Sequence, residues 1–287
     1  MTDALPVIPP TFDAVSRWQA IVERRRAQMD AVYAEAGMSS ADYWARRAAA
    51  YRKSLHERVD QDPFFMRVQA SVSPESEVLD VGAGTGRHTL ALAPHVRRVV
   101  AVDPSEAMLS LLRQDVAAAA LSNVEAIHAD WMSAQLEPAD AVICSHVLYP
   151  IADVVPFIRK LETHARGRVW IYIRVDPLAT DLGLWKEFHG IPLQDQPTFV
   201  DLYPVLLQMG VVADVEVVEH RFTLTYASVD EAVAQVRNGV CLREDDEEGT
   251  ARLRALLERL LTRTEAGRYG PPIESARSAI ISWARRT

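Results

Sequence analysis

The feature that most constrains the fold is a glycine-rich turn that joins a short apolar run to a helical pattern. Residues 78–86 read Val-Leu-Asp-Val-Gly-Ala-Gly-Thr-Gly, so alternating glycines follow a run that is apolar except for Asp80. Glycine lets a backbone turn sharply and approach a ligand, and the free amides of the following helix point at the same place. The segment therefore predicts a strand, a tight turn and a helix that together form a ligand site.

The spacing of these glycines distinguishes the turn from two other ligand-binding loops. A dinucleotide fingerprint, G-x-G-x-x-G, would need a glycine at position 87 if it began at Gly82, and the chain has Arg87 there. A phosphate-binding P-loop would need a following Gly-Lys-Ser or Gly-Lys-Thr, which the chain lacks. The pattern is G-x-G-x-G, with Asp80 two residues before its first glycine.

Beyond the turn, short apolar runs alternate with helical stretches. We expect strands at 78–81, 99–102, 124–128, 141–145 and 169–175, and helices at about 86–94, 105–119 and 153–164. This alternation is typical of a parallel sheet. A helix at 199–208, a β-rich run of one or two strands at 212–226 and a last strand at 279–283 follow.

Helical patterns also precede this region and interrupt its end. Apolar residues recur at helical spacing from 12 to about 36, and further helices are expected from Ser40 and from Asp62-Pro63. Helices at 229–237 and 250–263 flank an acidic loop at 244–248. We expect a helical cap over residues 1–73, a core over 74–227, and a helical insertion with the closing strand of the core over 228–287.

Three segments of the core resemble the motifs of the class I S-adenosylmethionine-dependent methyltransferases. The turn at 80–86 has the form acid-x-G-x-G-x-G of their first motif, and residues 99–103, Val-Val-Ala-Val-Asp, resemble their second. Residues 129–131, Ala-Asp-Trp, resemble the motif after their third strand. The order of elements from about 77 to 219, half the chain, also matches. The resemblance implies an α/β fold with a Rossmann-like, doubly wound, mostly parallel seven-stranded sheet.

The same resemblance implies a cofactor, S-adenosylmethionine, with S-adenosylhomocysteine as its product. It implies that Asp103 binds both ribose hydroxyls, which suits a carboxylate that can accept two hydroxyl hydrogens. It implies that Asp130 meets the adenine amine. The expected cofactor-binding residues are Asp80, Gly82, Ala83, Gly84, Gly86, Asp103, Pro104, Met108, Asp130, Trp131 and Ser145.

Four of these residues also have a purely structural interpretation. Asp80 could cap the turn, although an acid in an apolar strand is costly unless it has a partner. Asp103 could be a helix N-cap, since Pro-Ser-Glu follows it. Met108 could belong to the core, and Asp130 could lie in a solvated turn.

The candidate catalytic residues, His146 and Tyr149, follow the fourth expected strand. Methyl transfer from a sulfonium needs alignment and exclusion of water, and a base only where the acceptor must lose a proton. Histidine, with an unperturbed pKa of about 6.5, suits a general base, and Tyr149 could orient or deprotonate an acceptor. His146 could instead be only a hydrogen-bonded residue beneath the cofactor.

Composition limits the partners and the compartment. The chain has 31 Lys plus Arg against 39 Asp plus Glu, a net charge of −8, and its three consecutive arginines at 24–26 fit a solvated helix face, so we expect no nucleic acid partner. Cys144 and Cys241 are too few for a disulfide framework, and the histidines lack metal-ligand spacing, so we expect no metal. Without a signal peptide or membrane span in the sequence, we expect a cytoplasmic protein with no membrane partner.

These observations predict an enzyme that methylates an O or N atom of a small organic molecule. In the resembled family, nucleic-acid amine methyltransferases end the fourth strand in Asn/Asp-Pro-Pro-Tyr/Phe, from which Ser-His-Val-Leu at 145–148 departs. Aromatic residues of the N-terminal helices could supply apolar walls for a small acceptor. Two alternatives stay open: a protein methyltransferase, and a regulatory protein that binds S-adenosylmethionine without turnover.

Overall fold

A computed structural model describes residues 12–37, 39, 59–176, 183–221, 225–243, 245–264, 267–271 and 275–285 of the chain. The helix expected from Ser40 falls outside these residues. So does residue 244, the first position of the expected acidic loop.

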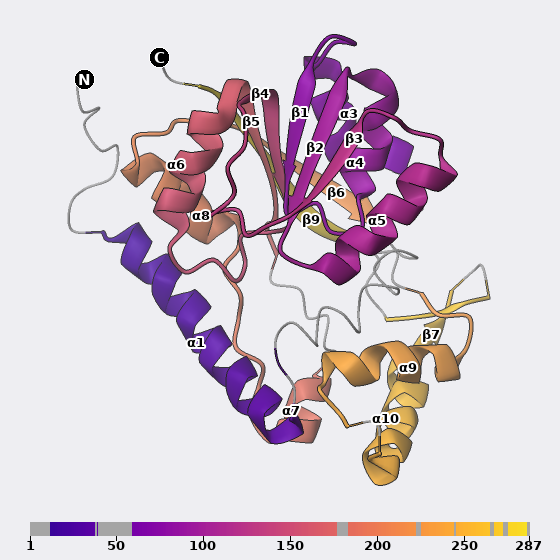
Figure 1. Ribbon diagram of the computed structural model, residues 1–287. Coiled ribbons are helices and arrows are strands. Elements are labelled where there is room, and N and C mark those ends of the chain that lie inside the picture. Colours follow the sequence, from indigo (N-terminus) through magenta and orange to yellow (C-terminus); the bar gives the residue numbers. More distant parts are fainter. Residues whose placement is uncertain are drawn as a thin grey trace.

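A seven-stranded sheet in the order β3-β2-β1-β4-β5-β9-β6 forms the centre of the described structure (Figure 1). Strands β1 to β5 pair in parallel, and β9 is antiparallel to both of its neighbours, β5 and β6. The mostly parallel, doubly wound sheet expected from the sequence is therefore confirmed. The strands are β1 (Glu77–Val81), β2 (Arg98–Asp103), β3 (Val124–His128), β4 (Ala139–Ser145), β5 (Ala165–Arg174), β6 (Asp214–Arg221) and β9 (Ser275–Ala284).

The strand order places a ligand position at the middle of the sheet. Within the sheet, β1 is followed by β2 and β3 on one side, and β4 is then added on the other side of β1. At such a switch point, the loops after β1 and β4 diverge and leave a crevice at the carboxyl ends of the strands. The glycine turn and the two candidate catalytic residues follow these two strands.

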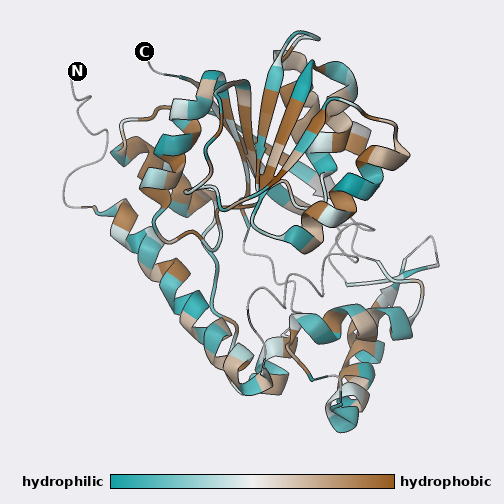
Figure 2. Cartoon of the chain, in the orientation of Figure 1, coloured by the Kyte–Doolittle hydropathy of each residue, from teal (hydrophilic) through white to brown (hydrophobic). Residues whose placement is uncertain are grey.

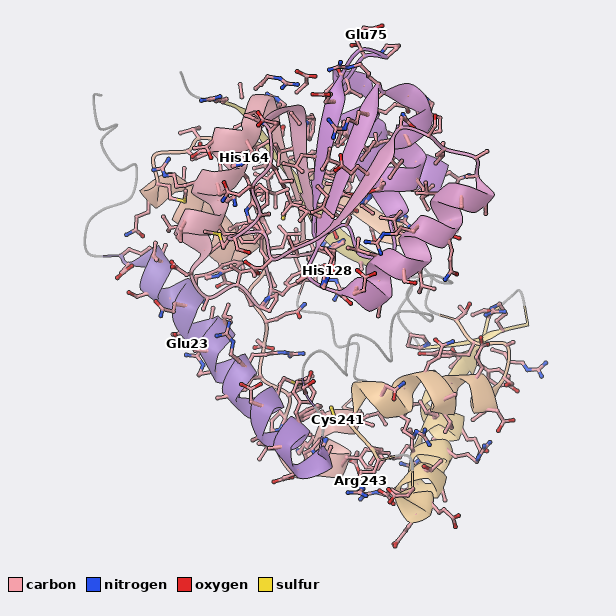
Figure 3. All side chains as sticks on the ribbon, in the orientation of Figure 1. Glu23, Glu75, His128, His164, Cys241 and Arg243 are labelled. Atoms are coloured by element: carbon pink, nitrogen blue, oxygen red, sulfur yellow. The ribbon has the colours of Figure 1, made fainter. Side chains whose placement is uncertain are left out.

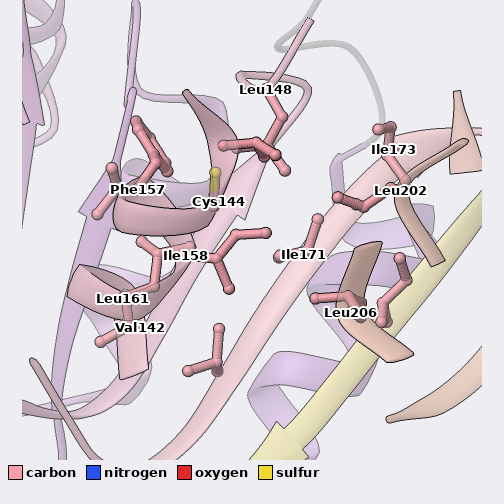
Figure 4. Packing of buried hydrophobic residues seen from close by; sticks show 14 of the residues in the cluster. Val142, Cys144, Leu148, Phe157, Ile158, Leu161, Ile171, Ile173, Leu202 and Leu206 are labelled. Carbon is pink, nitrogen blue, oxygen red and sulfur yellow. The ribbon is translucent and has the colours of Figure 1, made fainter. Parts of the chain in front are cut away.

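In the part of the chain that the structure describes, helices cover both faces of the sheet. On one face, α6 (Val154–His164) and α8 (Phe199–Gln208) share an apolar core with β4 and β5, and α1 (Ala14–Ala36) packs against these two helices. Figure 4 shows part of this core, where Phe157, Ile158 and Leu161 of α6 contact the sheet. The other face carries α3 (Pro63–Ser71), α4 (Arg87–Leu92) and α5 (Glu106–Ala118).

Burial on both faces explains why the strands are apolar along their length. In Figure 2 the strands are mostly hydrophobic, whereas the helices show hydrophilic residues on their outer sides. Buried side chains alternate between the two faces along β1, since Leu79 and Val81 pack with α6 and Val78 packs with α3. A strand covered on both sides has little room for polar residues, which makes Asp80 in β1 notable.

Helix α1 begins and ends at capping residues. The Asp13 carboxylate accepts the Ser16 amide hydrogen at 3.0 Å, and Gly37 ends the helix with φ 64°. The first half of α1 packs on the sheet core through Trp18 and Val22. Its last turn leaves the core and packs, through Val32 and Tyr33, with Trp185 and Cys241.

A second cluster of helices lies beyond the carboxyl ends of the strands. It consists of α7 (Leu184–His189), α9 (Val229–Gly239) and α10 (Glu247–Leu260), which share an apolar core, with a small hairpin of β7 (Thr262–Arg263) and β8 (Tyr269–Gly270). In Figure 3, Glu75 lies near the amino ends of the strands and His128 lies at their carboxyl ends. Cys241 lies with these helices on the His128 side. We call this group of helices the satellite.

Two helices, α7 and α10, differ from what the sequence predicts. Helix α10 begins three residues before the expected Thr250, because Asp246 caps it by accepting the Gly249 amide hydrogen at 2.7 Å. The sequence predicts no element at helix α7, because six residues between two left-handed glycines, Gly183 and Gly190, are too short to show a period. The β-rich run contains one strand, β6, in the residues that the structure describes.

Candidate cofactor and acceptor site

The glycine turn leaves β1 by bonding to the neighbouring strand. The amides of Gly82 and Ala83 donate to the Val102 carbonyl of β2 at 2.8 and 3.2 Å. Gly82, Gly84 and Gly86 have φ angles of 73°, 56° and 85°. These left-handed conformations are unfavourable for residues with a Cβ, so each glycine is required by the backbone itself.

The three glycines differ in what surrounds them. A Cβ on Gly82 would lie 2.3 Å from Val147 Cγ2, and one on Gly86 would lie 2.3 Å from Leu112 Cδ1. A Cβ on Gly84 would meet no heavy atom within 4 Å. Gly82 and Gly86 are therefore packed against the protein, whereas Gly84 faces open space where a ligand could approach the backbone.

Asp103, the last residue of β2, is bonded to that open part of the turn. Its side chain is 8% exposed, and its Oδ2 accepts the Gly84 amide hydrogen at 2.9 Å while its Oδ1 accepts that of Ser105 at 2.8 Å. Burial raises the pKa of Asp103, and the two amide hydrogen bonds partly oppose this. Each carboxylate oxygen still has a second lone pair for a ligand hydroxyl. The N-cap of α5 is Ser105, whose hydroxyl accepts the Met108 amide hydrogen at 3.4 Å.

Asp80 has a partner inside the protein. Its Oδ2 accepts the Thr89 hydroxyl hydrogen at 2.6 Å, which ties β1 to α4 beneath the turn. Burial raises the pKa of Asp80, while the charge of His88 and the Thr89 hydrogen bond lower it. The buried acid therefore has the hydrogen-bond partner that its position demands, and this partner is a neighbouring helix.

The two residues after β3 lie in different surroundings. Asp130 is exposed, and its Oδ1 accepts the Met132 amide hydrogen at 2.9 Å, so it caps a surface turn. Trp131 is only 4% exposed, and its indole N–H donates to the Phe157 carbonyl of α6 at 3.3 Å. The Trp131 side chain is therefore part of the core under α6, on the opposite face of the sheet from α5.

The remaining expected cofactor residues lie around Asp103 and at the end of β4. Met108 is buried in the first turn of α5, as its structural interpretation anticipated. Pro104 is exposed, and its carbonyl oxygen lies 3.0 Å from His128 Nε2 at the end of β3. Ser145 is half-buried as the last residue of β4.

The structure brings His146 and Tyr149 into direct contact. His146 Nδ1 lies 2.8 Å from the Tyr149 hydroxyl oxygen, which also accepts the Arg174 amide hydrogen at 3.1 Å. The His146 amide donates to the Tyr172 carbonyl at 2.8 Å. His146 has φ 58°, a conformation that is rare for residues other than glycine and that often accompanies functional sites. We call His146 and Tyr149 the dyad.

Proton placement within the dyad decides what it can do. If the tyrosine hydroxyl donates to Nδ1, then Nε2 of a neutral His146 carries its proton and can only donate. If Nδ1–H donates to the tyrosine oxygen, then Nε2 of a neutral His146 is unprotonated and can accept a proton from a bound molecule. The second arrangement is the one that a general base requires.

Helix α1 holds the turn that carries the dyad, which sequence reasoning missed. Trp18 is fully buried, and its indole N–H donates to the Ile151 carbonyl at 2.7 Å; two turns later, Arg26 donates to the Pro150 carbonyl at 2.8 Å. Arg25 donates to the Gln194 carbonyl. Two of the three arginines expected on a solvated face are therefore bonded to backbone carbonyls. No local pattern in the sequence indicates these long-range contacts.

Two negative findings apply to the residues that the structure describes. They contain no group of three or more His, Cys, Asp or Glu side chains placed to hold a metal ion. None of their helices combines the length and the apolar character that a membrane crossing requires.

Comparison with known proteins agrees with this geometry. Residues 78–166 match the family model described as "Methyltransferase domain". A curated relative, the probable ribosomal RNA small subunit methyltransferase A of Methanosphaera stadtmanae, is 28% identical over 103 residues, which cover 36% of this chain and 37% of the relative. The chain thus matches little more than a third of that relative's length.

Two solved structures have a similar fold. The YcgJ protein of Bacillus subtilis superposes with a TM-score of 0.53 at 15% identity, over 79% of this chain and 100% of that one. A putative methyltransferase of Bacillus halodurans gives a TM-score of 0.54 at 16% identity with the same two coverages. The glycine turn and strands β1 to β4, apart from Glu77, lie within the segment that matches the family model, so residues 78–166 are similar to a methyltransferase domain and the sheet has the Rossmann-like order.

Proposed function

We propose that the protein transfers a methyl group from S-adenosylmethionine to an O or N atom of a small organic molecule. The observation that carries this proposal is the pairing of Asp103 with Gly84. A buried carboxylate is bonded to the amide of the one glycine in the turn whose Cβ position is open, at the carboxyl ends of the strands. This arrangement suits a ligand that offers hydroxyl groups to Asp103 and lies close to the backbone at Gly84.

The residues present fit the cofactor. Gly84 leaves room for close approach, Asp103 has lone pairs for the ribose hydroxyls, and the exposed Asp130 follows β3 on the same edge of the sheet. When bound, S-adenosylmethionine supplies an electrophilic methyl group. Gly82, Gly86 and Asp80 would act indirectly, by keeping the turn and α4 in place.

The dyad would remove the proton that the acceptor loses on methylation. With Nδ1–H donated to Tyr149, the Nε2 atom of His146 can remove a proton from a hydroxyl or amine as it is methylated. Tyr149 is itself held by the Arg174 amide, so it fixes the orientation of the imidazole. A general base of this kind contributes typically about 10²–10⁴-fold in rate.

The cap and the satellite would enclose the acceptor. We propose that residues 1–73 form a cap on the core at 74–227, and that 228–287 add a helical insertion and the closing strand. Contacts of Trp18 with the core and the position of the satellite beyond the strand ends support this division. A cytoplasmic location would suit the two cysteines, which are both buried and are not joined in a disulfide.

Charge and local sequence favour a small acceptor over a nucleic acid. The net charge is −8, and Arg25 and Arg26 are bonded to carbonyls of the protein. The residues after β4 lack the Asn/Asp-Pro-Pro-Tyr/Phe pattern of nucleic-acid amine methyltransferases. However, the curated relative is named as a ribosomal RNA methyltransferase, so the expected exclusion of nucleic acid is not supported. Ribosomal RNA is therefore the second candidate acceptor.

A labelling experiment separates these possibilities. Purified protein is incubated with methyl-labelled S-adenosylmethionine and, in separate reactions, a small-molecule extract, a protein fraction and unmodified small-subunit ribosomal RNA. We expect label only in products of the small-molecule reaction, and none with Asp103→Ala. Label in the RNA or protein fraction would replace the proposed acceptor. Tight cofactor binding without label in any fraction would favour a regulatory protein.

A further inference from the structure

The buried carboxylate of Asp62, between α3 and α4, has no part in the proposed chemistry. Asp62 precedes α3 and is 7% exposed. Its Oδ1 accepts the Phe64 amide hydrogen at 2.9 Å, which makes it the N-cap of that helix. A helix cap needs only one carboxylate oxygen, so the second oxygen is available for another role.

The second oxygen of Asp62 contacts the helix that follows the glycine turn. Asp62 Oδ2 accepts hydrogen bonds from Arg87 Nε at 3.0 Å and from His88 Nε2 at 3.3 Å, and Arg87 Nη2 lies 2.9 Å away. Arg87 and His88 are the first two residues of α4, directly after Gly86. One carboxylate therefore holds both side chains of the turn's exit.

The contacts continue from these side chains to the strand behind the turn. The His88 side chain is buried, and its ring meets that of Phe64 edge-on at a centroid distance of 5.0 Å. The charge of His88 lowers the pKa of Asp80, and Asp80 in turn bonds to Thr89. Asp62, the first turn of α4 and the end of β1 thus form one connected polar cluster.

The charges in this cluster interact strongly because the cluster is buried. Desolvation alone would raise the pKa of Asp62, but the His88 hydrogen bond and the charges of His88 and Arg87 outweigh it and lower that pKa well below the usual range. The carboxylate is therefore ionised at neutral pH. Removing one member of such a buried group leaves its partners uncompensated.

We propose that Asp62 is a positioning residue for the cofactor turn, acting through Arg87 and His88. By holding these side chains against α3, Asp62 fixes the first turn of α4 and keeps the Arg87 guanidinium bonded behind the glycines. The backbone of the turn then keeps the conformation in which Gly84 stays open to the ligand and bonded to Asp103. This inference rests on the proposed function, because it assumes that the turn binds that cofactor.

The chain supplies a matched control for the alternative, in which Asp62 only caps α3. Asp13 caps α1 in the same way, by accepting the Ser16 amide hydrogen, and it is exposed. Asparagine is as good an N-cap as aspartate. Asp62→Asn and Asp13→Asn therefore both preserve a cap while removing one negative charge, and only the first change affects the residues after the glycine turn.

The test is calorimetric titration of S-adenosylhomocysteine into wild-type protein, Asp62→Asn, Arg87→Met, the double variant and Asp13→Asn. Circular dichroism first confirms that each variant is folded at the titration temperature. We expect Asp62→Asn and Arg87→Met each to weaken binding about tenfold, and Asp13→Asn to change it less than twofold. Residues that act through each other give non-additive effects, so the double variant should bind about as well as the weaker single variant.

Three results would overturn the proposal. Asp62→Asn could bind as tightly as wild type while unfolding more easily, which would make its role structural only. The two single effects could multiply in the double variant, which would mean that Asp62 does not act through Arg87. If Asp62→Asn does not fold, unchanged binding by Arg87→Met would have the same consequence. Failure of the wild-type protein to bind would instead refute the proposed function.

Discussion

Replacing Gly82 or Gly84 by alanine separates the folding role of the glycine turn from its ligand role. Both residues have positive φ angles, 73° and 56°, which cost a residue with a Cβ about 1–2 kcal/mol. At Gly82 the new methyl would also lie 2.3 and 2.8 Å from the two methyl groups of Val147. Overpacking of this kind costs about 1–3 kcal/mol, whereas at Gly84 the methyl meets no heavy atom within 4 Å.

The two variants should therefore differ in both measurements. We expect Gly82→Ala to lower the free energy of unfolding by about 2–5 kcal/mol and Gly84→Ala by about 1–2 kcal/mol, as measured by urea unfolding followed by circular dichroism. In calorimetry, Gly84→Ala should lose detectable binding of S-adenosylhomocysteine, because its methyl stands in the space that the ligand needs. The variant that is less damaged in folding is thus the one expected to lose the ligand.

Two outcomes would refute this reasoning. If Gly84→Ala bound S-adenosylhomocysteine as tightly as wild type, the open space at Gly84 would not be the cofactor position. If Gly82→Ala were as stable as Gly84→Ala, Val147 would have to move without cost, and the close packing behind the turn would carry no energy. The comparison uses the same substitution at both positions, so the loss of glycine's flexibility in the unfolded chain cancels.

Three further predictions concern Asp62, the turn after β4 and the dyad. Because the pKa of Asp62 is lowered in the folded protein, its contribution to stability is complete above the unfolded pKa of about 3.9 and is lost as the pH falls further, so the difference in unfolding free energy between wild type and Asp62→Asn should shrink below about pH 4 in urea titrations. Trp18→Phe leaves the Ile151 carbonyl without its donor, at a cost of about 1–3 kcal/mol, and should speed hydrogen exchange in residues 146–151 but not in β1; equal rates would contradict the bracing role of α1. Once an acceptor is identified, His146→Gln should lower kcat about 10²–10⁴-fold with little change in cofactor affinity, and an unchanged kcat would remove the base from the mechanism.

Elements with strong local signals could be predicted closely from the sequence. The bounds of α8, 199–208, were anticipated in full, and a capping box of Thr198 and Asp201 marks its beginning. Helix α10 was placed too late because Glu247 and Glu248 were read as part of an acidic loop. In the structure they form its first turn, where negative charge interacts favourably with the helix dipole.

Some residues of the candidate site could likewise be predicted from the sequence, and others could not. The glycine turn and Asp103 could be found because their chemistry lies within short motifs. The roles of Trp18 and Asp62 could not, since their partners, Ile151 and Arg87, are brought close only by packing. A short motif also does not indicate which way each side chain points. The Trp131 ring points into the core, although its neighbour Asp130 is exposed.

The central claim is that the turn at 82–86 and Asp103 bind S-adenosylmethionine. Calorimetry with S-adenosylmethionine, S-adenosylhomocysteine and NAD, on wild type and Asp103→Ala, tests it most directly. We expect micromolar binding of the first two ligands by wild type, strongly weakened in Asp103→Ala, and no comparable binding of NAD. Tighter binding of NAD, or undiminished binding of S-adenosylhomocysteine by Asp103→Ala, would contradict the claim.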